Sequence, residues 1–80
     1  MKVKFNGELR NVAEKPYEFN GNKGLSYSIT LEVEEGSFYM KTTKEVFELY
    51  KQGYLEKGQQ CEFTADYSPM YKSFRVTQVA

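Results

Sequence analysis

The chain has 80 residues, of which 40% are hydrophobic and 28% charged, as in a globular domain rather than a disordered segment. Eleven Lys and Arg residues balance eleven Asp and Glu residues, which argues against a protein that holds duplex DNA mainly through its phosphates. No apolar run is long enough to cross a membrane, the first residues lack the apolar core of a signal peptide, and the single cysteine cannot form an internal disulfide. We therefore expect one cytoplasmic domain over residues 1–80, with no membrane partner.

The first predicted strand covers residues 2–12, where apolar and polar side chains alternate and Gly7 interrupts the pattern as a bulge or sharp bend would. Residues 13–24 predict a loop, because they hold a proline and the run Asn20-Gly21-Asn22. The clearest strand follows over residues 25–34, where alternation of period two is unbroken.

A tight hairpin turn is expected at Glu35-Gly36, and it would pair Val33 with Phe38 across the two strands. At Thr42 the period becomes helical, and a glutamate three residues later completes the pattern of a capping box. The helix is expected to end at Gly53, because glycine is the preferred residue just after a helix.

Two more strands are predicted at residues 61–67 and 73–80, with Phe74 and Val76 of the last strand pointing inward. The order is therefore three strands, one helix and two strands. A five-stranded, partly open Greek-key barrel with one short helix between the third and fourth strands is the OB-fold arrangement. We predict this mainly β fold. An SH3-like barrel is the alternative, although such barrels usually hold only a single helical turn, late in the chain.

The chain has few residues that could act in catalysis or bind a metal ion. The chain has no histidine and one cysteine, which excludes Ser-His-Asp and Cys-His catalysis, His-containing zinc sites and four-cysteine clusters. Neither phosphate-binding nor dinucleotide-binding glycine motifs are present. The paired carboxylates Glu34 and Glu35 lie at the tip of a predicted hairpin, where neither would be buried. We expect neither an enzyme nor a cofactor.

Aromatic residues make up 16% of the chain, and they gather at residues 14–24 and 66–74, the two connections that bind ligands in OB-folds. Lysines or an arginine accompany the rings in both connections. Stacking a base on an exposed ring contributes roughly 1–3 kcal/mol with little regard to which base it is. The pattern predicts sequence-tolerant binding of single-stranded DNA, with RNA as an alternative ligand. The predicted contact residues are Arg10, Lys15, Tyr17, Phe19, Lys23, Tyr39, Lys41, Tyr71, Lys72 and Arg75.

The same rings fit two other interpretations. Loop aromatics can fold back as lids over a small barrel core, and Phe19 and Tyr67 are the strongest candidates for that role. The rings, with Met70 beside Tyr71, also fit a protein-interaction module, since Met and Tyr are enriched at interfaces. Acidic residues near the loops, Asp66 among them, weaken the attraction for phosphates and favour low-affinity or cooperative binding of a nucleic acid.

Two segments carry a resemblance to a known family. The lead Gly24-x-x-Tyr27-Ser28 into a long strand, and the late segment YKSFRVTQV, are similar to those of small phage single-stranded DNA-binding proteins, the filamentous-phage type in particular. The resemblance implies a dimer that coats single strands cooperatively in replication or recombination, with Tyr27 near the bound strand. Strand alternation, by contrast, points Tyr27 inward. The helix that starts at Thr42 departs from the filamentous-phage pattern and is more similar to the proteins of other phages and of bacteria.

Overall fold

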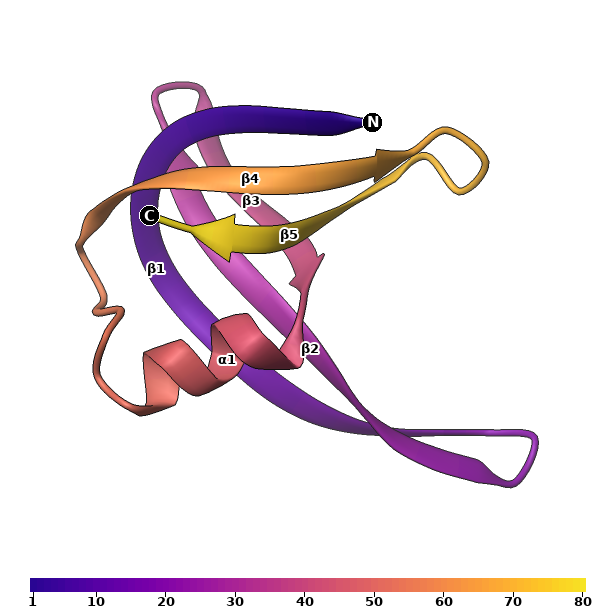
Figure 1. The fold of residues 1–80 in the computed structure, drawn as a ribbon. Coiled ribbons are helices and arrows are strands. Elements are labelled where there is room, and N and C mark those ends of the chain that lie inside the picture. Colours follow the sequence, from indigo (N-terminus) through magenta and orange to yellow (C-terminus); the bar gives the residue numbers. More distant parts are fainter.

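The computed structural model of the protein describes all of residues 1–80 (Figure 1). Its strands are β1 (Lys2–Phe19), β2 (Asn22–Val33), β3 (Gly36–Thr42), β4 (Gln60–Ser68) and β5 (Ser73–Val79), and helix α1 (Lys44–Lys51) follows β3. The strands form a closed barrel in the order β1-β2-β3-β5-β4. A five-stranded barrel with its helix between the third and fourth strands is an OB-fold, which confirms the prediction over the SH3-like alternative.

Strand β1 closes the barrel by changing partners, since it pairs with β4 up to Glu8 and with β2 from Glu8 onward. Gly7 lies at this change, and a Cβ there would come within 3.0 Å of the Glu32 carbonyl oxygen. Glycine therefore favours the close approach of the two backbones, because a Cβ would be tighter than an ordinary contact. The bulge that was expected at Gly7 lies instead at Arg10, where the register with β2 shifts.

The prediction of a loop at residues 13–24 is wrong, because β1 and β2 continue through this segment as a long two-stranded arm. Phe19 pairs with Asn22, and the turn is the dipeptide Asn20-Gly21, with φ values of 49° and 79°. Asn-Gly favours this two-residue turn because both positions require positive φ. Along the arm β1 has only β2 beside it, so Pro16 can lie in the strand without leaving a second neighbour unpaired.

The hairpin between β2 and β3 turns at Glu34-Glu35, one residue earlier than predicted. Val33 pairs with Gly36, and Leu31 pairs with Phe38, so the predicted pairing of Val33 with Phe38 is wrong by two residues. Because side chains alternate with a period of two, this shift leaves Phe38 on the predicted face of the strand.

Helix α1 begins one residue later than predicted, with Thr43 as its N-cap. The Thr43 hydroxyl oxygen accepts a hydrogen bond from the Val46 N–H at 3.3 Å. Thr42 ends β3 instead, and its buried hydroxyl donates to the Val76 carbonyl oxygen at 2.8 Å. The chain leaves the helix through Gly53, whose φ is 91°, as the sequence predicted. With eight residues, α1 is too short to cross a membrane.

The hydrophobic core fills the barrel and continues under α1. Apolar side chains at the two barrel ends are less covered, and Phe74, which was predicted to point inward, is 40% exposed. The buried residues of the core are Leu9, Val12, Ile29, Leu31, Val46, Leu55, Cys61, Phe63, Ala65 and Val76.

Candidate nucleic-acid interface

The β1–β2 arm and the β4–β5 hairpin project from the same side of the barrel (Figure 1). Between them β3 and β5 meet in parallel, with Lys41 beside Arg75 and Thr42 beside Val76. We call this junction the β3–β5 seam. It places two basic side chains at neighbouring positions between the two projecting hairpins.

Two hollows lie on either side of the seam. The arm hollow, of about 520 Å³, is bounded by the arm and the start of α1, and the hairpin hollow, of about 580 Å³, by the β4–β5 hairpin. Lys41 and Arg75 line both, so the two hollows form one continuous surface across the seam. The arm hollow is otherwise lined by Tyr17, Leu25, Ser26, Tyr27, Thr42, Thr43 and Lys44. The hairpin hollow is otherwise lined by Asp66, Tyr67, Ser68, Tyr71, Ser73 and Phe74.

Tyr17 presents an aromatic ring at the arm end of this surface. It is 52% exposed and lies opposite Gly24 in the β1–β2 ladder. A Cβ built on Gly24 would come within 2.6–2.8 Å of the Tyr17 ring and hydroxyl, so the ring lies directly over the glycine backbone. The absent side chain at Gly24 therefore lets the Tyr17 ring lie flat against the arm.

Tyr27 lines the arm hollow and also contacts the helix. Its ring packs on Phe47 of α1, with centroids 5.3 Å apart. Partial burial, and then the Glu14 carboxylate opposite it in the β1–β2 ladder, raise the pKa of the Tyr27 hydroxyl. Tyr27 is therefore half-buried, in part agreement with the inward direction predicted from strand alternation. The position near a bound strand that the resemblance implies stays a prediction.

The β4–β5 hairpin has two kinds of aromatic residue: rings that pack on each other, and a ring that is exposed to solvent. The Tyr67 ring packs on Phe74, with centroids 4.8 Å apart, and is half-buried. Tyr71 is 77% exposed in the turn, beside the exposed Met70. Lys72 follows with a φ of 50°, an uncommon backbone conformation for a residue other than glycine. The Tyr71 ring is thus free to contact a ligand.

Other predicted contact residues lie outside the two hollows. Lys15 and Lys23 are exposed along the arm, and Phe19, 70% exposed near its tip, is not a lid over the core. Tyr39 is exposed on β3, although it faces Thr30 rather than the predicted Glu32. Lys72 lies in the β4–β5 turn without lining either hollow.

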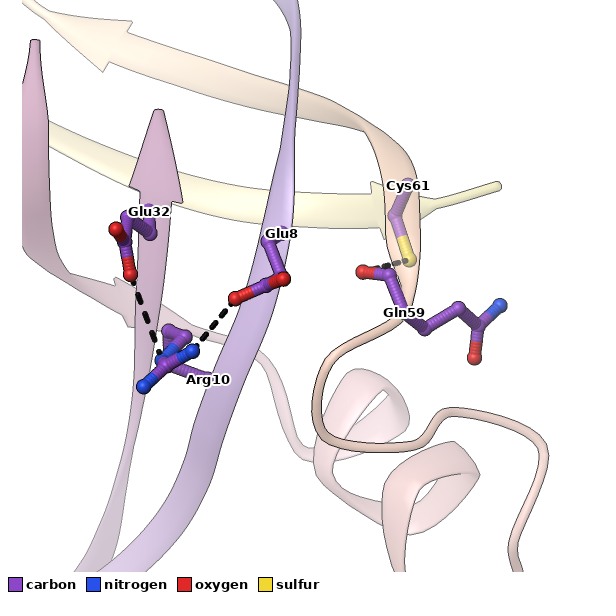
Figure 2. Close-up of polar contacts among 5 residues, drawn as sticks. All are labelled: Glu8, Arg10, Glu32, Gln59 and Cys61. Carbon is purple, nitrogen blue, oxygen red and sulfur yellow. Dashed lines mark hydrogen bonds and ion pairs between the residues drawn. The ribbon is translucent and has the colours of Figure 1, made fainter. Parts of the chain in front are cut away.

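Arg10 is held by two carboxylates, as Figure 2 shows. Its Nη1 lies 2.6 Å from Glu8 Oε2, and its Nε lies 3.6 Å from Glu32 Oε2. The hydrogen bond to Glu8 and the charges of both carboxylates raise the pKa of Arg10. Its charge is already compensated, so we leave Arg10 out of the candidate interface. No group of three or more His, Cys, Asp or Glu side chains is placed to hold a metal ion.

Lys44 is the cation that the sequence did not point to. It is the first residue of α1 and lines the arm hollow, with its Nζ 3.8 Å from Glu48 Oε1. A contact this long between two exposed side chains contributes little, so Lys44 stays available to a ligand. The sequence feature that marks Lys44 is its position directly after the N-cap, between the end of β3 and the first turn of α1.

Comparisons with known proteins do not assign the chain to a family. No family model matches it, and no curated protein matches it. A solution NMR structure of the OB domain of Ta0387 from Thermoplasma acidophilum is similar, with 11% sequence identity and a TM-score of 0.49. The match covers 95% of this chain and 65% of that one. The assignment as an OB-fold rests on the strand order and helix position described above.

Proposed function

We propose that the protein binds single-stranded DNA across the two hollows, with little preference for sequence. The observation that carries this proposal is that Lys41 and Arg75 line both hollows, while each hollow has an exposed tyrosine on its outer side, Tyr17 or Tyr71. OB-folds use the connections between strands 1 and 2 and between strands 4 and 5 to bind oligonucleotides and oligosaccharides. Cations beside the rings favour the oligonucleotide, because it brings phosphates.

In this arrangement bases stack on Tyr17 and Tyr71 while the phosphates between them pass over the seam. Lys41 and Arg75 neutralise backbone charge there, and Lys44 adds a third cation at the arm side. A duplex keeps its bases stacked on each other, so it can use the cations but not the rings. The selectivity for single strands therefore comes from the rings, and the salt dependence comes from the cations.

The proposal extends to replication or recombination, the processes that expose single-stranded DNA. The resemblance to phage single-stranded DNA-binding proteins supports this setting, and it also supports a homodimer. A cooperative coat would compensate for a neutral chain whose individual sites bind weakly.

A tyrosine-fluorescence titration tests the proposal directly, because seven Tyr residues report without interference from Trp. Oligo-dT should quench the fluorescence, and duplex DNA of the same length should quench it far less. If three cations contact phosphates, raising the salt from 50 to 200 mM weakens binding by roughly twentyfold. Oligo-U in a parallel titration decides whether RNA is bound as well. Absence of quenching by either single strand, at both salt concentrations, would refute the proposal.

Replacing Gly24 with alanine should weaken oligo-dT binding while leaving the free energy of unfolding within about 1 kcal/mol. The new Cβ must displace the Tyr17 ring, which is the flexible end of an exposed side chain. We expect the binding free energy to weaken by no more than the roughly 1–3 kcal/mol that one stacked ring contributes. In a Tyr17→Ala background the same substitution should cost no further affinity, and an independent loss there would show that Gly24 acts in another way.

Replacing Asp66 with asparagine should strengthen oligo-dT binding by about threefold at low salt. Asp66 lines the hairpin hollow and lies opposite Arg75 in the β4–β5 ladder, so its charge opposes the phosphates at the seam. Glu62→Gln makes the same charge change on β4 away from both hollows and serves as the control. Equal gains in the two variants would mean that only the net charge of the protein matters.

A further inference from the structure

A third depression, an apolar groove of about 560 Å³, is left unexplained by nucleic-acid binding. It lies where β2 ends and β3 begins, whereas α1 covers the barrel end where β3 finishes (Figure 1). Lys4 and Glu35 are the charged residues that line it, one of each sign, so the groove offers no net attraction to phosphates. Its apolar lining includes Val3, Phe5, Val33, Phe38, Met40 and Phe74. Phe38 and Phe74 are 45% and 40% exposed in it.

The groove lies beside an unpaired strand edge. Residues 36–40 of β3 pair with β2 on one side, whereas β5 reaches β3 only at Lys41 and Thr42. No backbone hydrogen bond outside the regular elements involves residues 36–40. This edge therefore offers unpaired backbone donors and acceptors next to exposed apolar side chains.

The sequence of this edge contains none of the features that usually prevent strand pairing. Exposed edges in natural proteins carry lysine, proline, inward charges or bulges. The segment GSFYM at residues 36–40 has no charged residue and no proline, and its ladder with β2 runs without a bulge. An edge of this kind is a template on which another extended chain can pair.

We propose that an extended segment of a partner protein adds a strand along residues 36–40 of β3 and inserts alternate apolar side chains into the groove. In such strand addition the main-chain hydrogen bonds give affinity, and pockets for every second side chain give specificity. Phe38 and Met40 contribute the groove wall from β3 itself, and Phe74 contributes it from across the gap to β5. The partner segment is therefore uncharged on the face that enters the groove, and apolar at every second position.

A phage-displayed library of random peptides of about seven residues, the length of an ordinary strand, provides the test. Selection on the immobilised protein should enrich peptides that are apolar at alternate positions. Phe38→Ser should lower the affinity for a synthetic copy of an enriched peptide by at least about tenfold, because the groove loses one of its apolar side chains. Phe19→Ser, which changes an exposed phenylalanine on the arm, should leave peptide affinity unchanged. Methylating the peptide amides along one edge should abolish binding without any change to the protein, and thermal melting checks that each variant is folded.

Several results would overturn this inference. They include failure to enrich any alternating peptide, peptides that tolerate methylation of every amide, and peptides whose binding survives Phe38→Ser but is lost on Tyr71→Ala. Loss of oligo-dT binding in the folded Phe38→Ser variant would assign the groove to the nucleic acid. Self-association that Phe38→Ser abolishes, in sedimentation at several concentrations, would assign the edge to a second copy of the chain.

Discussion

Replacing both Tyr17 and Tyr71 with alanine is expected to weaken oligo-dT binding by about 2–6 kcal/mol, which is at least about thirtyfold. The two rings stand on separate hairpins at opposite sides of the seam, so their contributions should add. Both side chains are mostly exposed, and the melting temperature should change little. Anisotropy of a labelled oligo-dT measures the loss without depending on the tyrosine signal.

Tyr54→Ala is the matched control for this double variant. Tyr54 is a 70% exposed tyrosine that lines neither hollow, and its loss should leave the affinity for oligo-dT unchanged. A double variant that melts at a much lower temperature, yet binds normally while folded, would assign the two rings to the core rather than to a ligand.

Replacing Phe63 with alanine is expected to lower the free energy of unfolding by about 3–5 kcal/mol. Phe63 is fully buried at the centre of β4, and its ring stacks on Phe5 with centroids 5.6 Å apart. A domain of this size is stable by roughly 4–12 kcal/mol in total, so the loss is a large fraction of what holds the fold.

Urea denaturation followed by circular dichroism measures the effect of Phe63→Ala. Phe19→Ala removes the same side chain from an exposed site near the tip of the arm and should change the free energy of unfolding by less than about 0.5 kcal/mol. Similar losses in the two variants would contradict the position of Phe63 in the core.

The barrel could be predicted because the type and order of its elements suffice to define it. Alternation over β2 and β4, and the change of period after β3, are properties of neighbouring residues, and they were visible without any tertiary contact. The arm was missed because proline and glycine were taken as loop signals, although Asn20-Gly21 is a strong hairpin signal. The pairing register of β2 and β3 was predicted two residues away from the observed one. The sequence pattern does not reveal this error, because a shift of two residues leaves every side chain on its predicted face.

The site was predictable where it depends on fold geometry, and was missed where it depends on register. Tyr17 and Tyr71 were chosen because an OB-fold brings their connections to one side of the barrel, and both do line the hollows there. Their contact with a ligand stays a prediction. The contacts of Arg10 with Glu8 and Glu32 could not be predicted, because they depend on the bulge in β1, which the sequence suggested at another position. Lys44 was missed because its place beside the N-cap does not indicate that the arm lies nearby.

The seam between β3 and β5 has a consequence for the motions of the barrel. Only two residue pairs and the Thr42 hydroxyl close it, and the two segments are 34 residues apart in the chain. Lys41 and Arg75 lie at paired positions across it and carry like charges, so we expect a repulsion that lets the free protein open here at a lower energetic cost than along its other ladders. A phosphate chain lying over both cations would remove that repulsion and hold the strands together. Amide hydrogen exchange near Thr42 and Val76 should therefore be fast in the free protein and slow once oligo-dT is bound. In that case the bound oligonucleotide would help to keep the barrel closed around its core.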